Sequence, residues 1–460
     1  MLSMTYSHTS QLSCNAGLLG PSLAEICQSS QFIVFLSILN EFTRSNDKIS
    51  RSCERIKPIE TPDEEYDFVV IGGGSAGAVV AARLSENPDW KVLLVEAGSD
   101  EPAGAQVPGF SESLIGTTVD WNYTSINESY ACLGTNGTCP IAAGKMLGGC
   151  SAHNGMIYIR GNPTDYDNWA AMGNKGWTWD EVKPFYLISE DNGEIERVGS
   201  FYHATGGPLS VERFPYVPSF GNSILAAAVE AGYGVSEDLN GEQITGFTIA
   251  QTTSKNGVRR SSARAFLWPV RNRKNLHVSL NSLATRVLIR NNKAVGVEYF
   301  QNGQLKTVRV SREVVISAGT LKSPQILLLS GIGPKNHLEK VGVKVVKDLP
   351  GVGENFHDQV VHANRFTINE ADNYDNDHTI AAEYLVNQTG LLSSHGLNQV
   401  MATLKSRHAR SSYPDLQAYF NGYTTTCAPG ELNALQSTGR RTVVIRAVNL
   451  RPWSRGKLMR

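Results

Sequence analysis

The sequence contains no uninterrupted apolar run of the roughly 18 residues needed to cross a membrane. Its longest candidate, FIVFLSIL at residues 32–39, is too short to span a bilayer. An excess of either charge is also absent, because 42 Lys and Arg residues oppose 43 Asp and Glu residues, and this balance gives no electrostatic footprint for nucleic acid. At 460 residues and 41% hydrophobic composition, the chain is expected to form two or three globular domains.

Cysteine is scarce, and the seven residues include no CxxC pair, so no metal site is expected. Cys132 and Cys139 bracket the turn-forming sequence LGTNGT and are predicted to close a small disulfide loop. Four N-glycosylation sequons occur, three of them beside this loop, at Asn122, Asn127, Asn136 and Asn387. Together these features favour an oxidising, extracellular location. The alternative is that the sequons arise by chance and the two thiols are free.

Residues 1–62 are polar, Ser-rich and only weakly periodic. The run at 32–39 is compatible with the apolar centre of a signal peptide, although it starts late and no Lys or Arg precedes it. We therefore predict a leader that directs secretion, with its mode of action left open.

The segment YDFVVIGGGSAGAVVAARLSENPDWKVLLVEAG, beginning at Tyr66, carries the clearest signal. Two short apolar runs are predicted to be buried parallel strands, and a helix is predicted between them. Gly72, Gly74 and Gly77 form GxGxxG at the strand-to-helix turn, where backbone amides stabilise a pyrophosphate. Glu96 ends the second strand and is predicted to accept hydrogen bonds from a ribose. An acid at this position disfavours a 2′-phosphate, and hence NADP, but the motif alone does not separate NAD from FAD.

A second stretch, GKMLGGCSAHNGMIYIRG at residues 144–161, combines glycines with small polar residues ahead of a β-prone run. We refer to it as the glycine-rich loop. Further along the chain come NGVRRSSARAFL at 256–267, SAGTLKSPQILLLSGIG at 317–333 and DLPGVGENFHDQ at 348–359. With these blocks in this order, the sequence from about residue 63 onward resembles the glucose–methanol–choline (GMC) family of flavin oxidoreductases, in particular its insect glucose dehydrogenase-like branch.

The resemblance implies FAD as the cofactor, with the glycine-rich loop passing over the flavin ring and pyrophosphate. Glycines at 148, 149 and 155 would then let the backbone approach a flat ligand without Cβ contacts. Val287 matches a family position whose backbone contacts the adenine, although the residue by itself is typical of a strand core. The expected cofactor-binding residues are Gly72, Gly74, Ser75, Ala76, Gly77, Glu96, Met146, Gly149, His153, Asn154, Gly155, Met156, Ile157 and Val287.

His153 departs from the usual family signature, in which an aliphatic residue is common at this place. Some relatives resembling choline oxidase carry a histidine here that is bonded covalently to the flavin, so a covalent link through His153 is one hypothesis. The alternative is that the histidine packs or hydrogen-bonds near the ring. His357, in DLPGVGENFHDQ, is expected to be structural or adjacent to the cofactor and not a catalytic base.

The expected fold is α/β, with a Rossmann-type FAD-binding domain at 63–360 and an incomplete α+β substrate-binding domain at 361–460. Within the first domain we predict a helix at 223–234, a meander of strands with NN and NG turns at 283–319, and a short helix at 324–333. Family members usually extend further and carry a catalytic His/His or His/Asn region near the C-terminus. That region is absent here, so no catalytic residue is assigned.

The resemblance implies an oxidoreductase that moves a hydride from the CH–OH group of an alcohol or sugar to FAD, with a quinone or oxygen as acceptor. Activity of this chain stays open, because truncation is expected to impair it. One alternative is a non-catalytic FAD-binding remnant. Another is an NAD-dependent dehydrogenase, against which the flavin-specific glycine-rich loop argues.

Overall fold

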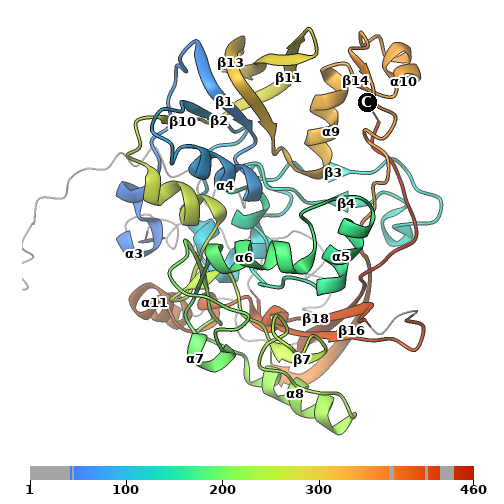
Figure 1. The fold of residues 1–460 in the computed structure, drawn as a ribbon. Helices are drawn as coiled ribbons and strands as arrows, with labels where there is room; N and C mark the ends of the chain where they lie inside the picture. Colours follow the sequence, from blue (N-terminus) through green and yellow to red (C-terminus); the bar gives the residue numbers. More distant parts are fainter. Residues whose placement is uncertain (1–41, 44–45, 372–377, 410–412, 425–439, 460) are drawn as a thin grey trace, which may run out of the picture.

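A computed structural model describes residues 42–43, 46–371, 378–409, 413–424 and 440–459 of the chain. The apolar run at 32–39 and the cysteines at 14, 27 and 427 lie outside these ranges. Two sheets lie at opposite ends of the molecule, with helices and long loops between them (Figure 1). None of the described helices is both long enough and apolar enough to cross a membrane.

The first sheet has six strands in the order β10-β2-β1-β13-β12-β11. Four of them are parallel, and the antiparallel strands β12 and β11 extend the sheet on one side. Their bounds are β1 Glu65–Ile71, β2 Val92–Val95, β10 Leu276–Ser279, β11 Ser282–Arg290, β12 Lys293–Gln301 and β13 Gln304–Ile316. The buried parallel strands predicted from YDFVVIG and KVLLVEAG are therefore confirmed, as is the Rossmann-type α/β arrangement.

Both faces of this sheet are covered, because alternate residues of β1 and β2 enter different cores. Val70 and Leu94 pack against α4 (Ser75–Leu84) and the turn at 263–267. Val69 and Leu93 instead join the core that includes residues of β11, β12 and α9 (Gly319–Leu329). Such two-sided burial accounts for the near-continuous apolar character of these strands.

The predicted meander forms β11, β12 and β13, joined by two tight turns. Asn291 and Asn292 have φ of 49° and 60°, and Asn302 and Gly303 have φ of 50° and 76°. Two-residue hairpin loops of this kind favour Asn and Gly, because the positive φ matches the twist of the paired strands. The NN and NG turns are thus confirmed.

Two helix predictions have the right position but start too late. The helix predicted at 223–234 is α8, Ser219–Glu230, with Gly232 at φ 81° just after its end. The helix predicted at 324–333 is α9, which begins at Gly319 and contains Pro324 in its interior. This helix also ends earlier than predicted, at Leu329, and Gly331 follows it with φ of 81°.

The second sheet has five antiparallel strands in the order β16-β19-β18-β17-β7. Their bounds are β7 Gly246–Ile249, β16 Val360–Ala371, β17 Val400–Leu404, β18 Leu416–Asn421 and β19 Arg440–Asn449. Strand β7 comes from within the range assigned to the FAD-binding domain, yet it pairs with β17. The chain therefore crosses between the two parts of the molecule more often than a single boundary at residue 360 allows.

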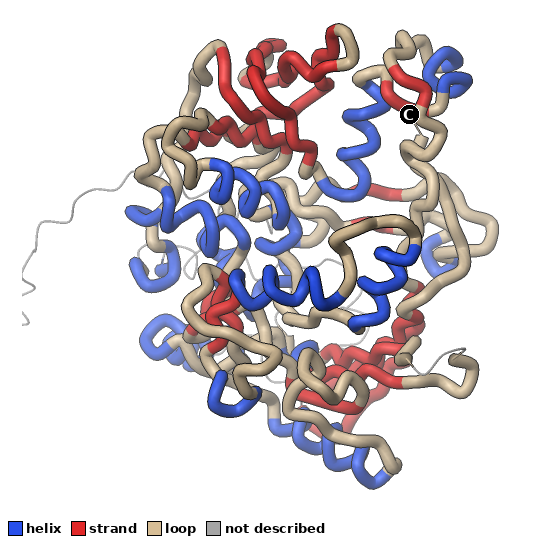
Figure 2. Tube along the Cα trace, viewed as in Figure 1, coloured by secondary structure: helices blue, strands red, loops and turns tan. Residues whose placement is uncertain are grey.

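Shorter elements connect the sheets and cover their surfaces (Figure 2). The remaining helices are α3 Asp47–Ser50, α5 Pro163–Ala171, α6 Trp179–Ser189, α7 Ile195–Val198, α10 Lys335–Lys340 and α11 His378–Asn387. Two-stranded ladders join β3 (Tyr123–Thr124) to β4 (Pro140–Ile141), β5 (Glu190–Asn192) to β6 (Leu209–Val211), β8 (Ser254–Lys255) to β9 (Val258–Arg259), and β14 (Ile332–Gly333) to β15 (Lys347–Asp348). After β19 the chain returns to the segment between β15 and β16, where the Leu458 amide donates a hydrogen bond to the Gly353 carbonyl.

The predicted disulfide loop is confirmed: Cys132 and Cys139 are bonded. Cys53 is disulfide-bonded as well. The four sequon asparagines, Asn122, Asn127, Asn136 and Asn387, are all exposed.

Candidate functional site

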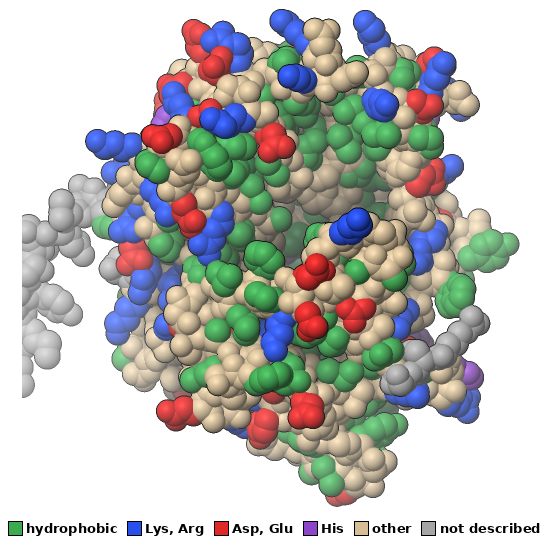
Figure 3. Space-filling view, in the orientation of Figure 1, with side chains coloured by type: hydrophobic (Ala, Val, Ile, Leu, Met, Phe, Trp, Pro, Cys, Tyr) green, Lys and Arg blue, Asp and Glu red, His purple; other side chains and the backbone are tan. Residues whose placement is uncertain are grey.

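The principal pocket has a volume of about 580 Å³ and lies at the carboxyl ends of the parallel strands. Ile71, Val95 and Ile316 end β1, β2 and β13, and all three line it. In open α/β sheets this edge is where ligands bind. A hollow is visible between the two halves of the molecule in Figure 3.

One wall of the pocket is formed by Gly72 and Gly74, from the turn between β1 and α4, and by Ser75 and Ala76 at the start of α4. Gly74 is the N-cap of α4, so the first backbone amides of the helix face this wall. Gly77 lies behind the turn, where an added Cβ would sit 1.8 Å from the carbonyl oxygen of Gly72. Only glycine lets helix and strand approach this closely.

Glu96 is buried at the end of β2 and holds the turn in place. Its Oε2 accepts a hydrogen bond from the Gly73 amide at 2.7 Å, and its Oε1 accepts one from the Gly98 amide at 2.8 Å. Burial raises the pKa of Glu96, although these backbone bonds oppose the rise. Each carboxylate oxygen can accept more than one hydrogen bond. Glu96 can therefore still accept a hydrogen bond from a hydroxyl of a ligand in the pocket.

The glycine-rich loop packs directly onto this turn. The Gly148 amide donates to the Gly73 carbonyl at 2.8 Å. Gly149 has φ of 52°, and a Cβ there would lie 2.7 Å from the Cα of Gly74. The scarcity of side chains in this part of the loop therefore reflects a backbone-to-backbone contact at the edge of the pocket.

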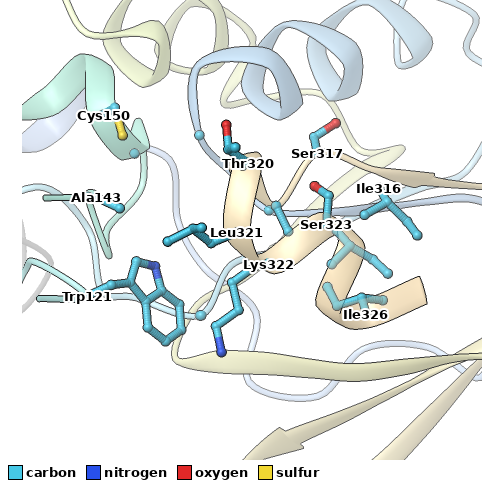
Figure 4. Close-up of a pocket in the computed structure, with 18 of the residues that line it drawn as sticks. Trp121, Ala143, Cys150, Ile316, Ser317, Thr320, Leu321, Lys322, Ser323 and Ile326 are labelled. Atoms are coloured by element: carbon cyan, nitrogen blue, oxygen red, sulfur yellow. The ribbon is translucent and has the colours of Figure 1, made fainter. Parts of the chain in front are cut away.

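A further part of the lining comes from the N-terminal turn of α9 and from aromatic residues that include Trp121 (Figure 4). Lys322 Nζ lies 4.6 Å from the ring centroid of Trp121, and Lys145 Nζ lies 5.1 Å from the same ring. Burial, and then the charge of Lys145, lower the pKa of Lys322. Two ammonium groups beside one ring give this part of the lining a positive potential that complements a phosphorylated ligand.

Arg259 fixes the middle of the glycine-rich loop. Its guanidinium is fully buried and donates to the Ala105 carbonyl, the Ser151 carbonyl, Asn154 Oδ1 and Ser111 Oγ at 2.7–3.1 Å. Burial lowers its pKa to about 10, which still leaves the group charged at neutral pH. Asn154 is thereby held in one orientation.

Two buried imidazoles flank Asn154 and Gly155. His153 is 6% exposed and His395 is 2% exposed, and the Nε2 atom of each lacks a hydrogen-bond partner. A Cβ on Gly155 would lie 3.0 Å from His395 Nδ1, so this ring packs on the loop backbone. Glu112 Oε1 lies 3.7 Å from His395 Nε2, too far for a hydrogen bond.

Both imidazoles are neutral at pH 7. Burial is the main cause in each case: it lowers the pKa of His395 to about 4 and also lowers the pKa of His153. A neutral imidazole with an unpartnered nitrogen can exchange a hydrogen bond or a proton with a bound molecule.

The expected site residues divide into those that line the pocket and those that do not. The lining includes Gly72, Gly74, Ser75, Ala76, Glu96 and Gly149. The residues outside the lining are Gly77, Met146, His153, Asn154, Gly155, Met156, Ile157 and Val287. Val287 is buried in β11, and its amide donates to Ser330 Oγ at 2.8 Å.

Sequence reasoning assigned no role to several residues that the fold brings to the site. Trp121 and Lys322 line the pocket. His357, which was expected to be structural or adjacent to the cofactor, lines it as well. His395 and Arg259 lie far along the chain from the loop that they contact. Three of the recognised blocks contain such residues: Lys322 lies in SAGTLKSPQILLLSGIG, Arg259 in NGVRRSSARAFL and His357 in DLPGVGENFHDQ.

The downstream end of the glycine-rich loop is anchored by a buried ionic cluster. Arg160 Nη2 lies 2.8 Å from Glu190 Oε2, and His203 lies between Glu190 Oε1 (2.8 Å) and Asp238 Oδ2 (2.9 Å). Burial alone would lower the pKa of His203, but the bonds and charges of the two carboxylates outweigh it and raise the pKa. His203 is thus buried and paired with both carboxylates.

This cluster predicts a pH-dependent stability that His203→Gln removes. A raised pKa means that the contribution of His203 is complete below the unfolded-state pKa of about 6.5 and is lost as pH rises through the higher folded-state pKa. We expect the free energy of unfolding of the wild type, minus that of the variant, to fall as pH rises above about 6.5. Urea unfolding at several pH values measures this difference. A difference that does not change with pH would contradict the prediction.

Comparison with known proteins identifies the family. The profile described as GMC oxidoreductase matches residues 66–361. Glucose dehydrogenase [FAD, quinone] of Drosophila melanogaster is 48% identical over 445 residues, covering 95% of this chain and 71% of that protein. Ecdysone oxidase of Bombyx mori is 34% identical over 417 residues, covering 85% of this chain and 61% of that protein.

Solved structures agree in fold. Pyridoxine 4-oxidase from Mesorbium loti superposes with a TM-score of 0.72 at 28% identity, covering 86% of this chain and 73% of the other. A variant of Aspergillus oryzae formate oxidase gives 0.74 at 24% identity, covering 86% and 74%.

Proposed function

The chain belongs to the GMC oxidoreductase family, and on this premise we propose that it is an FAD-dependent enzyme that oxidises the CH–OH group of an alcohol or sugar. The observation that carries the proposal is the 580 Å³ pocket, which combines a GxGxxG turn, a buried acid and the glycine-rich loop. This volume lies within the range of about 300–1,000 Å³ typical of small-molecule and cofactor sites.

The lining residues fit a flavin dinucleotide. Gly74 and Gly149 leave a wall without side chains for the pyrophosphate, next to the amides at the start of α4. Glu96 would accept hydrogen bonds from the ribose, and Lys322, near Trp121, adds positive charge to the lining. We propose that Val287, Met146 and Met156 act by packing behind this wall, since they are buried outside the lining.

FAD, when bound, supplies the hydride acceptor for the CH–OH carbon. The chain's own residues would position the reacting groups. Asn154, fixed by Arg259, would present a side chain to the ring, and Gly155 would let the backbone approach it. We propose that the substrate lies on the side of the loop where His153 and His395 offer unpartnered nitrogens.

The proposal is tested by expressing the full chain, adding FAD, and recording a visible spectrum after gel filtration. Retained flavin that is reduced on adding an alcohol or sugar, and reoxidised by a quinone dye or oxygen, supports the proposed enzyme. Flavin that is retained but not reduced by any alcohol would indicate a non-catalytic FAD-binding protein. A chain that retains no flavin would contradict the cofactor site itself.

His153 allows a separate prediction about how the flavin is held. Its imidazole is neutral and its Nε2 atom is unpartnered, as a covalent bond to the flavin requires. If the bond forms, acid precipitation should leave yellow flavin in the protein pellet, and His153→Ala should release all of it to the supernatant. Complete release from the wild type would exclude the covalent link and leave a packing role for His153.

We also propose that a quinone or oxygen accepts the electrons of the reduced flavin, which the reoxidation step of the spectral test measures.

We further propose that the protein is secreted and glycosylated. The proposal rests on the Cys132–Cys139 disulfide and the exposed sequon asparagines. Expression of the full chain in insect cells, followed by enzymatic removal of N-glycans, should reduce its apparent mass in the medium. Protein found only inside the cells at its unmodified mass would contradict this.

A further inference from the structure

A second cavity, of about 340 Å³, shares no lining residue with the cofactor pocket. Four arginines line it: Arg51, Arg260, Arg264 and Arg271. Its only lining carboxylate is Glu54, which is already 2.7 Å from Arg51 Nη1. Within the described parts of the chain, the other three arginines form no ion pair. The lining is therefore rich in positive charge, which Glu54, Asp191 and Glu212 offset in part at Arg260 and Glu101 offsets in part at Arg264.

Several hydrogen-bond donors at this cavity are buried without partners. Arg264 is 4% exposed and Trp268 is 2% exposed. Arg264 Nε, Arg260 Nε and Trp268 Nε1 each lack a hydrogen-bond partner. An unsatisfied buried donor destabilises a protein, and one next to other cations does so more strongly. All three nitrogens belong to residues that line the cavity, and none has an acceptor among the described residues.

The backbone builds this arrangement from two unusual turns. A π-helical turn at Ala263–Leu267 runs directly into a 3₁₀ turn at Trp268–Val270. π-helical turns are rare and occur frequently at functional sites. The turns place the Arg264 guanidinium 5.1 Å from the Trp268 ring centroid, and Arg271 donates to the Trp268 carbonyl at 3.0 Å.

We propose that this cavity binds a small oxyanion, either inorganic phosphate, sulfate or the phosphate of a monoester. Planar guanidinium groups recognise such oxygens by paired hydrogen bonds, and an indole N–H adds another donor. A volume near the lower limit for ligand sites suits a ligand of this size. The charges involved also act on each other: burial, and then the charge of Arg260, lower the pKa of Arg264 to about 9. A bound dianion relieves this repulsion.

Thermal unfolding of the FAD-loaded protein tests the proposal, with sodium phosphate or sulfate compared with sodium chloride at equal ionic strength. We expect phosphate to raise the midpoint in a saturable way and sodium chloride to have no such effect. Arg260→Gln should weaken phosphate binding about tenfold or more, because it removes a buried charged donor.

Arg309→Gln is the matched control, because Arg309 is an exposed arginine on β13 that lies outside the cavity lining. It changes the net charge equally and should respond to phosphate as the wild type does. The proposal would be overturned if phosphate raised the unfolding midpoints of the Gln variants at 260 and 309 equally. It would also be overturned if phosphate raised the wild-type midpoint no more than chloride does. Arg271→Gln provides the same test if the variant at 260 does not fold.

Two further measurements show whether the ligand is a free oxyanion or a phosphate monoester, and which of the two cavities it occupies. Phenyl phosphate that binds about tenfold more tightly than inorganic phosphate would indicate a monoester ligand, whereas equal affinity would indicate the free ion. The visible flavin spectrum should stay unchanged throughout the titration. Flavin loss that parallels the phosphate effect would place the ion in the dinucleotide pocket and overturn the proposal.

Discussion

Replacing Gly149 by alanine should abolish stable FAD binding. The new Cβ would lie 2.7 Å from the Cα of Gly74, a backbone atom that cannot move without shifting the turn at the proposed pyrophosphate position. A positive φ costs a non-glycine residue about 1–2 kcal/mol, and overpacking adds about 1–3 kcal/mol. If both costs fall on the cofactor-bound state, the Kd for FAD should rise about thirtyfold to several thousandfold. Flavin fluorescence titration of the purified protein measures this value.

Gly116→Ala separates the cost of a positive φ from the cost of the steric clash. Gly116 also has a positive φ, of 74°, but no atom lies within 4 Å of a Cβ built there. This variant should show the loss of stability caused by backbone strain and keep the wild-type affinity for FAD. An unchanged Kd in the Gly149 variant would mean that the glycine-rich loop does not border the dinucleotide, and would remove the main support for the cofactor site.

The strand–helix–strand segment with the GxGxxG turn was predictable because its sequence signals are local. A strand, a glycine turn, a helix and a second strand follow one another within about thirty residues, and each is specified by its own sequence. The turns with Asn292 and Gly303 are local in the same way, since positive φ selects Asn and Gly whatever surrounds them. The family resemblance then supplied the order of the blocks and the cofactor.

Contacts between distant segments were not predictable in this way. Strand β7 has only four residues, GFTI, and nothing in them indicates pairing with residues 400–403. Arg259 occurs in a recognised block, but its partners Ala105, Ser111 and Asn154 are at least 105 residues away. His395 was unremarkable in the sequence, because burial against Gly155 gives it its character. Such properties arise only when the chain is packed.

Because the glycine-rich loop depends on such packing, we expect its position to be most sensitive to substitution of Arg259, which lies outside it in β9. Arg259→Met keeps much of the side-chain volume but removes donors from four buried acceptors. Disrupting a buried charged network costs about 3–5 kcal/mol, so the free energy of unfolding should fall by that amount. Asn154 would lose its fixed orientation, and the flavin affinity should fall with it. Urea unfolding and flavin titration measure the two effects.

Arg312→Met is the matched control, because Arg312 is half exposed and pairs with Asp67 at the surface. The same substitution there should cost less than about 1 kcal/mol. Arg259→Lys distinguishes charge from geometry: it keeps the cation, but one ammonium cannot reach the acceptors that the guanidinium fork spans. If Lys restores full stability, the buried charge alone matters. If Lys behaves almost like Met, the fork geometry holds Ser151 and Asn154 in place, and the orientation of the loop depends on a residue more than a hundred positions away.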